Sequence, residues 1–297
     1  MKQKTILKKI GECPICSSKK SSLYMDTQDY FYSQEPFSIT QCNECEFLYT
    51  NPVPQNMFKY YQTEKYYSHN TASGGVVSEI YSLLRRLNIK KKYNLLNKIT
   101  SGKSILDVGC GTGELLGYFK NKGWATMGIE PNDNARAIAY NNNDGNIYGE
   151  DHLAELKPKS FDIITLWHVL EHVEHLNTRM EELKRLIKKG GYLVFALPNI
   201  NSPDSKKYGA FWAALDVPRH LYHFNEKSFK KLLAKHGLKL VSSLPMKLDS
   251  YYVSMLSEKY MGNSLYMPAA FINGTISNIK AKKNNNYSSM IFVVRNI

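Results

Sequence analysis

The chain has 297 residues, 43% of them hydrophobic and 22% charged, which suits one large folded domain with a small accessory module. Lysine and arginine exceed aspartate and glutamate by 13. No long basic run alternates with aromatic residues, so we expect a solvated lysine-rich surface and no nucleic-acid partner, while peripheral contact with an anionic membrane stays open.

The first ten residues are too polar to form a signal peptide. No segment reaches the roughly 18 uninterrupted apolar residues that a membrane span needs. The most apolar stretch, 261–279, is interrupted by Gly262, Asn263, Pro268 and Asn273. We therefore expect a cytoplasmic protein without a membrane span. Cysteines in that compartment indicate metal binding or packing rather than disulfides.

Four of the five cysteines form two C-x-x-C pairs near the start of the chain: Cys13, Cys16, Cys42 and Cys45. Tetrahedral zinc needs four ligands, and each C-x-x-C turn supplies two. A module as small as residues 1–55 can hardly form a core without metal. We therefore predict a structural zinc ribbon, with four buried packing cysteines as the alternative. Four thiolates leave no open position for catalysis.

Residues 56–100 are predicted to connect this module to the rest of the chain. The segment 60–75 is rich in Tyr, Ser, Asn and Gly, which indicates a connector or a lid. Apolar residues at near-helical spacing, among them Ile80, Leu83, Leu84 and Leu87, predict a helix over 78–100.

Residues 101–297 alternate between strand-like and helix-like patterns. This alternation predicts an α/β fold, a mostly parallel seven-stranded sheet with helices on both faces. The expected strands are 104–108, 125–130, 146–148, 161–167, 192–197, 238–244 and 290–294, and the expected helices are 115–121, 133–140, 176–189 and 225–236. Two segments, 199–224 and 246–287, break the alternation and are predicted to be insertions.

The first of these strands runs into a glycine-rich turn, 107–113, which a helix follows. Glycines allow a ligand to approach the backbone, and the helix offers unpaired N–H groups. Glu130 ends the next strand, where a carboxylate can accept both hydroxyls of a ribose. The pattern suits a nicotinamide dinucleotide as well as another nucleoside cofactor. A tight turn without a ligand is the third alternative.

These segments resemble the motifs of class I S-adenosylmethionine-dependent methyltransferases, over about residues 80–245. The matching segments are 105–113, 128–131, 161–164 and 186–193. The resemblance implies a Rossmann-like fold and S-adenosylmethionine as cofactor. It places the glycine loop on the methionine part, Glu130 on the ribose and Glu150 or Asp151 by the adenine. The implied cofactor residues are Asp107, Gly109, Cys110, Gly111, Thr112, Gly113, Glu130, Pro131, Glu150, Asp151 and Trp167.

A second cluster follows the strand 161–167, where His168, Glu171 and His172 would share one face of a helix. Ubiquinone-pathway and small-RNA O-methyltransferases carry a similar E-x-x-E-H run that binds a divalent cation, and His168 replaces the first glutamate here. His220 and His223 are candidate further ligands of a second cation. Many class I enzymes carry a Leu-Glu-His run without metal, and His168 or His220 could then act as general base.

The cysteine module ahead of this domain is similar to that of methyltransferases from bacterial sugar and surface-polysaccharide pathways. Trp212 and Arg219 would suit a sugar-linked or anionic acceptor, or would anchor a lid. We expect methyl transfer to a hydroxyl of a small molecule, such as a sugar or glycan precursor. The alternatives are an RNA methyltransferase, C- or N-methylation of a nucleotide sugar, and a non-catalytic cofactor-binding assembly protein.

Overall fold

The computed structural model describes residues 5–61 and 76–296, and side chains within the helix that starts at Val76 from residue 85 onward. The predicted lid segment is therefore described only at Tyr60 and Tyr61, and residues 62–75 lie outside the described residues. The side chains of Ile80, Leu83 and Leu84 also lie outside them. The predicted helix of this region is observed as α2, Val76–Ile99.

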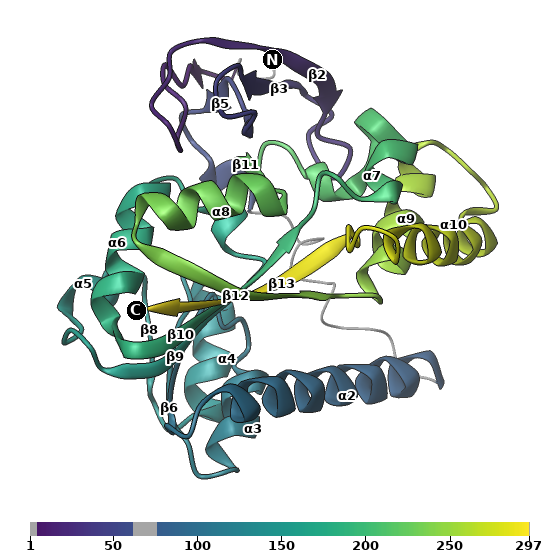
Figure 1. Ribbon diagram of the computed structural model, residues 1–297. Coiled ribbons are helices and arrows are strands. Elements are labelled where there is room, and N and C mark those ends of the chain that lie inside the picture. The colour runs from purple at the N-terminus through teal and green to yellow at the C-terminus, as the bar shows by residue number, and fades with distance from the viewer. Residues whose placement is uncertain (1–4, 62–75, 297) are drawn as a thin grey trace.

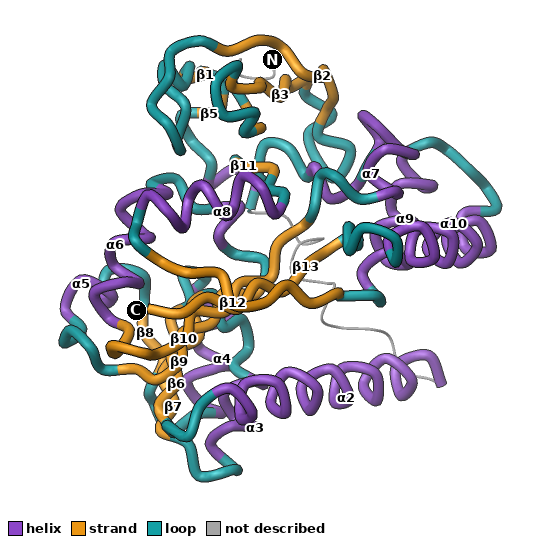
Figure 2. The backbone as a smooth tube through the Cα atoms, in the orientation of Figure 1, coloured by secondary structure: helices purple, strands orange, loops and turns teal. Residues whose placement is uncertain are grey.

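A seven-stranded sheet lies at the centre of the molecule, with helices above and below it (Figure 1, Figure 2). β13 pairs antiparallel with both of its neighbours, and every other pairing in the sheet is parallel. The mostly parallel α/β fold is thus confirmed. The strand order is β12 (Leu238–Pro245), β13 (Ser289–Asn296), β10 (Ile187–Pro198), β9 (Phe161–Trp167), β6 (Ser104–Val108), β7 (Ala125–Ile129) and β8 (Ile147–Tyr148).

Alternate strand residues fill two separate cores, because successive side chains point to opposite faces of a sheet. Ile105 and Ile163 pack with α2 and its neighbours, whereas Leu106 and Ile164 pack with the opposite helix layer. The first layer contains α2, α3 (Glu114–Lys120) and α4 (Asp133–Asn142), and the second contains α5 (His152–Glu155), α6 (Leu176–Leu186) and α8 (Glu226–Lys235).

The helix predicted over 176–189 ends three residues earlier, at Leu186. Ile187 is extended, fully buried and paired with Phe161, so it already belongs to β10. The pairing is irregular between Ile187 and Tyr192, and Gly190 has a φ of 77° there. Burial of Ile187 in the sheet therefore outweighs the helical tendency of the lysines that follow it.

The N-terminal residues form a second, four-stranded sheet that lies beyond α8 in Figure 1. One of its strands comes from the predicted insertion 199–224, because Tyr222 and His223 pair with Tyr49 and Leu48. The order is β11 (Tyr222–His223), β4 (Leu48–Thr50), β3 (Pro36–Cys42) and β2 (Ser21–Gln28), and β1 (Leu7–Lys8) pairs with β5 (Val53–Pro54). The cysteine segment and the insertion are therefore joined by a shared sheet.

Both predicted insertions contain helices. The first carries α7 (Pro203–Tyr208) and the 3-10 turns η3 (Gly209–Phe211) and η4 (Ala213–Leu215), and the second forms a hairpin of α9 (Asp249–Tyr260) and α10 (Tyr266–Ala281). The remaining 3-10 turns are η1 (Phe58–Tyr60) and η2 (Leu170–His172). Among the described helices, none combines the length and the apolar character that crossing a bilayer requires.

Candidate functional site

The glycine loop between β6 and α3 is tightly packed at its ends and open at its centre. Gly109 and Gly113 have φ angles of 73° and 75°, and a Cβ on them would lie 2.4 Å from Val169 and 2.3 Å from Asn143. Gly111 also has a positive φ, of 56°, but a Cβ there would meet nothing within 4 Å. The loop therefore exposes backbone to a ligand at the one position where space is open.

The other two residues of the loop contact the protein. Cys110 packs against Gly128 of β7, where a Cβ would lie 2.7 Å from the cysteine sulfur, and burial raises the pKa of its thiol. The hydroxyl of Thr112 lies 3.4 Å from Nη2 of Arg85, which ties the loop to α2. Cys110 therefore fits a packing role, whereas Thr112 lies at the rim of the loop.

Glu130 lies at the end of β7 with its carboxylate turned back to the glycine loop. Oε2 accepts a hydrogen bond from the N–H of Gly111 at 2.8 Å, and Oε1 accepts one from the N–H of Asn132 at 2.9 Å. Burial raises the pKa of Glu130, and these backbone donors oppose that rise. Each oxygen keeps a lone pair for the two hydroxyls of a ribose. Pro131 is exposed, and its carbonyl accepts from Arg136 at 3.2 Å.

Opposite charges meet at the ends of β6 and β9. Asp107 accepts a hydrogen bond from the Thr165 hydroxyl at 2.5 Å, and burial raises the pKa of Asp107 to about 6. The Lys92 ammonium lies 3.8 Å from the centroid of the Trp167 ring, and burial lowers the pKa of Lys92 to about 8. Nε1 of Trp167 is buried without an acceptor among the described residues. The site therefore fits an amino-acid group, which carries both a carboxylate and an ammonium.

Glu150 and Asp151 follow β8 at the edge of the sheet. Glu150 forms an ion pair with Arg179 of α6, whereas Asp151 is exposed just before α5. The rings of Tyr148 and His152 stack beside them, with centroids 4.0 Å apart. Asp151 is therefore the better candidate for an adenine contact, and that contact remains a prediction.

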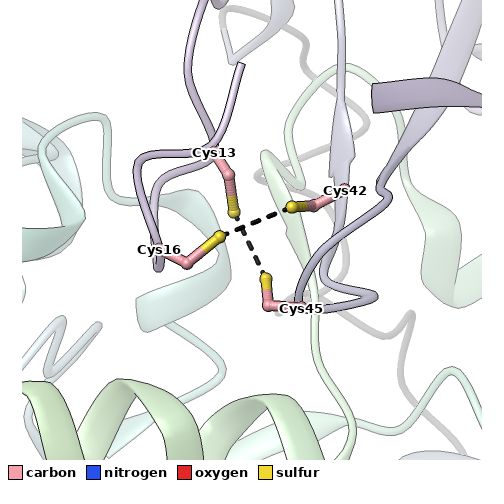
Figure 3. A group of neighbouring side chains, drawn as sticks. All are labelled: Cys13, Cys16, Cys42 and Cys45. Carbon is pink, nitrogen blue, oxygen red and sulfur yellow. Dashed lines mark hydrogen bonds between the residues drawn. The ribbon is translucent and has the colours of Figure 1, made fainter. Parts of the chain in front are cut away.

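The four N-terminal cysteines lie together, and their thiols point toward a common centre (Figure 3). Cys13 and Cys45 have sulfur atoms 3.5 Å apart, as do Cys16 and Cys42, and all four sulfurs lie within 4.8 Å of one another. Burial raises the pKa of Cys13 and Cys45. At Cys42 the effect of burial is outweighed by backbone N–H groups of Cys45 and Glu44 and by the neighbouring thiols, which lower its pKa to about 7. The cluster therefore fits a tetrahedral thiolate metal site.

A second cluster lies at the end of β9, where Glu171, His172 and His220 offer ligand atoms within 4.8 Å of one another. Nδ1 of His172 lies 3.1 Å from the carbonyl oxygen of Arg219, and Nδ1 of His220 lies 2.9 Å from that of Ala214. A carbonyl oxygen only accepts, so a proton on each Nδ1 would satisfy both contacts and leave Nε2 of each ring as the ligand atom. Nδ1 of His172 also lies 3.2 Å from the Tyr61 hydroxyl oxygen. Burial lowers the pKa of His172 to about 4, so the ring is neutral near pH 7.

Glu171 supplies the negative charge of this cluster. Its side chain is fully buried, and neither carboxylate oxygen receives a hydrogen bond from the described residues, although Nδ1 of His168 lies 3.3 Å from Oε1. The His168 imidazole lies against this carboxylate, and the carboxylate with the imidazoles of His172 and His220 is a ligand set that suits a divalent cation. Val169 packs against Gly109, so this cluster adjoins the cofactor loop.

His168 is not on the helix that we predicted for residues 168–172. It has a left-handed φ of 57°, and only Leu170–His172 form a 3-10 turn. Its Nε2 lies 3.2 Å from Asp249 of α9. Burial disfavours the imidazolium, but the Asp249 and Glu171 carboxylates outweigh it and raise the pKa of His168 to about 10. His168 is therefore cationic near neutral pH, which does not suit a general base.

His223 lies outside the cluster, although it is close in sequence. Its Nε2 is 3.1 Å from the Thr50 hydroxyl, and burial lowers its pKa to about 3. The Thr50 hydroxyl also donates to the carbonyl oxygen of His220 at 2.6 Å. His223 therefore helps to hold the N-terminal sheet against the histidine segment.

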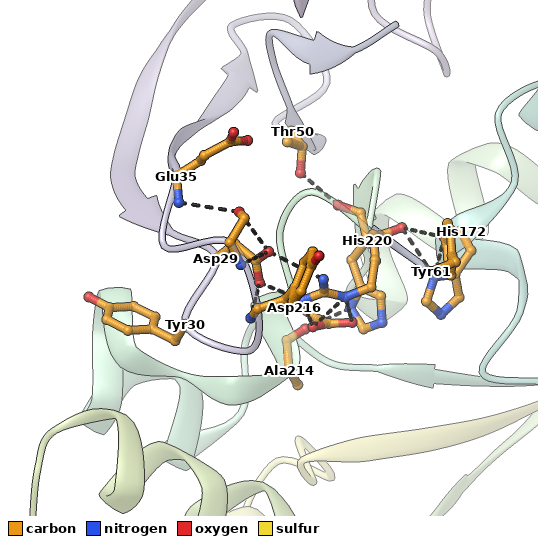
Figure 4. Close-up of polar contacts among 12 residues, drawn as sticks. Asp29, Tyr30, Glu35, Thr50, Tyr61, His172, Ala214, Asp216 and His220 are labelled. Atoms are coloured by element: carbon orange, nitrogen blue, oxygen red, sulfur yellow. Dashed lines mark hydrogen bonds and ion pairs between the residues drawn. The ribbon is translucent and has the colours of Figure 1, made fainter. Parts of the chain in front are cut away.

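Trp212 and Arg219 are anchors rather than surface groups for a substrate. Trp212 is buried and donates through Nε1 to Asp204 at 2.8 Å. Arg219 is 1% exposed and forms ion pairs with Asp29 of the N-terminal module at 2.7 Å and with Asp216 at 2.6 Å. Figure 4 shows Asp29 approaching Asp216 from the N-terminal chain, with His220 and Tyr61 between Asp29 and His172. Of the two alternatives for these residues, the structure favours the anchor.

Sequence reasoning missed Lys92, which lies over the Trp167 ring, Asp29, which pairs with Arg219, and Asp249, which pairs with His168. All three come from elements distant in sequence from the motifs, and lysines and aspartates are common on solvated surfaces. Their contacts become visible only in the folded structure. No sequence signal distinguishes Asp29 from its exposed neighbour Asp26.

Comparison with protein families gives a match to the family described as "Methyltransferase domain" over residues 82–243. A curated relative is the ubiquinone biosynthesis O-methyltransferase of Nitrosomonas europaea, 30% identical over 146 residues, which are 45% of this chain and 62% of the relative. The matched part of the chain thus spans less than two thirds of that relative.

Solved structures share the fold at low identity. Geranyl diphosphate C-methyltransferase from Streptomyces coelicolor A3(2) is 11% identical, with a TM-score of 0.52 over 79% of this chain and 88% of the other. Phosphoethanolamine N-methyltransferase 2 from Haemonchus contortus is 16% identical, with a TM-score of 0.50 over 93% of this chain and 68% of the other. At this level of identity, the likeness concerns the fold alone.

Proposed function

The chain belongs to the methyltransferase domain family and is a class I S-adenosylmethionine-dependent methyltransferase, and we propose that it methylates a hydroxyl oxygen of a small molecule. The observation that carries the proposal is the group of possible metal ligands formed by Glu171, His172 and His220 beside the cofactor loop. Oxygen as the acceptor atom is also supported by the name of the O-methyltransferase relative.

We propose that the cofactor is held by backbone and two carboxylates. Gly111 leaves room for the ligand, Glu130 accepts the ribose hydroxyls, and Asp107 with Lys92 faces the charged groups of the methionine part. Trp167 covers the same pocket. Methyl transfer then requires an acceptor oxygen in line with the bond between sulfur and the methyl carbon.

The acceptor hydroxyl has to lose a proton during transfer. Glu171, His172 and His220 would hold a divalent cation, which lowers the pKa of a hydroxyl that it binds. The carbonyl oxygens of Arg219 and Ala214 lie against Nδ1 of the two imidazoles, so Nε2 of each ring would be the ligand atom. Without a cation, Nε2 of His220 would be the general base.

The four N-terminal cysteines are proposed to bind one structural zinc ion. With it in place, β4 would hold β11 and the preceding residues Arg219 and His220 at the acceptor site. We propose a sugar-linked acceptor because a cysteine module ahead of this domain resembles enzymes of bacterial sugar pathways. Trp212 and Arg219 are buried anchors and cannot contact a sugar. The proposal of a sugar-linked acceptor therefore rests on the resemblance of the cysteine module.

A tritiated-methyl assay against fractionated cell extract tests the acceptor. We expect label in the small-molecule fraction, in a linkage that resists mild alkali as an ether does. Label in RNA, or no transfer to any fraction by a protein that binds S-adenosylmethionine, would contradict the proposal.

The cation is tested with Glu171→Gln, which keeps the shape and removes the charge, and with Glu174→Gln on an exposed neighbour as control. We expect about two equivalents of metal in the wild type and the control, and about one in Glu171→Gln. Transfer should fall at least about a hundredfold in the variant, while cofactor binding persists. Transfer unaffected by chelation would instead favour His220 as base.

A further inference from the structure

Helix α10 buries its small residues and exposes its large ones. Ala270, Gly274, Ser277 and Ala281 face the protein. The outward side chains are between 42% and 69% exposed: Leu265 just before the helix, then Met267, Phe271, Ile272, Ile276 and Ile279. A helix on the surface of a globular protein has the opposite distribution, with apolar residues inside.

Close packing of the hairpin fixes this orientation. A Cβ on Gly274 would lie 2.7 Å from the Tyr251 ring and 3.0 Å from the Tyr251 Cα, so α10 lies directly on the α9 backbone. The Ser250 hydroxyl donates to the carbonyl oxygen of Gly274 at 3.2 Å. Rotating α10 to bury Phe271 would break this contact, so the apolar face has to stay outward.

A continuous apolar face of this size usually marks a site for a partner or a membrane. Its charged surroundings distinguish the two. The segment 246–287 contains five lysines, which are all exposed: Lys247, Lys259, Lys280, Lys282 and Lys283. Its two carboxylates are engaged inside the protein, since Asp249 pairs with His168 and Glu258 accepts from Tyr208, Asn263 and Asn273.

The apolar face is therefore bordered by positive charge without exposed carboxylates. A second copy of the chain would bring another net charge of +13 against it. An anionic lipid surface complements both features, because lysines bind the headgroups while apolar side chains enter the acyl boundary. The helix has 16 residues, a length of about 24 Å, which suits a helix lying in the interface.

We propose that the outward face of α10 docks on a membrane that contains anionic lipid. The helix enters the headgroup region parallel to the surface, with Phe271 and Ile272 at the centre of the buried face. The hairpin begins at Asp249, which pairs with His168, so the docked surface is joined to the acceptor site by the single helix α9. The inference concerns binding and does not depend on the proposed acceptor.

Co-sedimentation of the full chain with vesicles tests the docking. We expect binding to vesicles of equal parts phosphatidylcholine and phosphatidylglycerol, weaker binding to phosphatidylcholine alone, and a decrease as salt rises. The double variant Phe271→Ser and Ile272→Ser should lower the partition coefficient about tenfold or more. Lys282→Gln should lower it about fivefold.

Leu23→Ser is the matched control, because Leu23 on β2 is 63% exposed and Phe271 is 68% exposed. It should bind vesicles as the wild type does, and S-adenosylmethionine binding should show that each variant is folded. Equal vesicle binding by the double variant and the wild type would overturn the proposal. A second outcome would also overturn it: a wild type that does not bind vesicles but is a dimer by light scattering, with the double variant a monomer. The face would then join two copies of the chain.

Discussion

The proposed cofactor side and the proposed acceptor side of the central sheet are built in different ways. Most of the cofactor side comes from one continuous segment, 104–130, in which backbone groups and Glu130 bond to each other. The acceptor side joins residues far apart in sequence: Thr50 donates to the backbone of His220, and the N–H of Leu221 donates to the Glu171 carbonyl at 2.8 Å. Cofactor binding should therefore survive changes that abolish methyl transfer.

The sharpest test of this difference is removal of the cysteine cluster. In Cys42→Ser, the module would lose a ligand of the proposed zinc ion, and with it the folding energy that would hold β4 against β11. We expect transfer to fall at least about a thousandfold, because zinc binding supplies on the order of 10 kcal/mol to such modules. The affinity for S-adenosylmethionine, measured by calorimetry, should change less than about threefold.

Cys110→Ser, outside the cluster, is the control and should keep the full zinc content. A Cys42→Ser protein that loses cofactor binding and transfer to the same extent would show that the two sides fold as one unit.

The ion pair between Asp29 and Arg219 tests the same connection without metal. Asp29→Ala leaves Arg219 buried with Asp216 as its remaining partner. We expect a loss of about 3–5 kcal/mol in the free energy of unfolding, measured with urea. Transfer should fall further than cofactor affinity, because the Arg219 carbonyl orients His172.

Asp26→Ala removes an exposed aspartate of β2, three residues before Asp29, and should cost less than about 0.5 kcal/mol. Equal losses in the two variants would mean that the buried pair does not position the acceptor site.

Asp107 gives the cofactor side a stability that depends on pH. Burial raises its pKa to about 6 from an ordinary value of 3.8. Between about pH 4 and pH 6, the carboxyl of Asp107 is therefore protonated in the folded state and ionised in the unfolded state. Its contribution to stability is therefore present below about pH 4 and is lost as the pH rises through about 6. The full shift corresponds to ~3 kcal/mol.

Asp107→Asn should remove that dependence and raise the stability of the cofactor-free protein at pH 7, while weakening S-adenosylmethionine binding. Thermal unfolding at pH 4, 5, 6 and 7 would measure it. An unchanged slope in the variant would assign the pH dependence to other groups.

The same contrast explains what the sequence could predict. The glycine loop and Glu130 were predictable because a strand, a turn and a helix in sequence order place them, and the sheet itself is confirmed. The single helix face expected for His168, Glu171 and His172 was wrong, because His168 adopts a left-handed φ and pairs with Asp249. Asp29 could not be identified, since its burial depends on Arg219, 190 residues away.

The smallest expected effect concerns the cofactor side alone. Glu130→Ala removes the acceptor for the N–H groups of Gly111 and Asn132 and for the ribose hydroxyls, whereas Glu130→Gln keeps one carbonyl oxygen. We expect the dissociation constant for S-adenosylmethionine to rise roughly thirtyfold in Glu130→Ala, about 2 kcal/mol, and less in Glu130→Gln. Zinc content and vesicle binding should not change, because no contact of Glu130 reaches the N-terminal module or α10 among the described residues. A loss of zinc in Glu130→Ala would contradict the independence of the two sides, since the cofactor side would then be needed for the N-terminal module to fold.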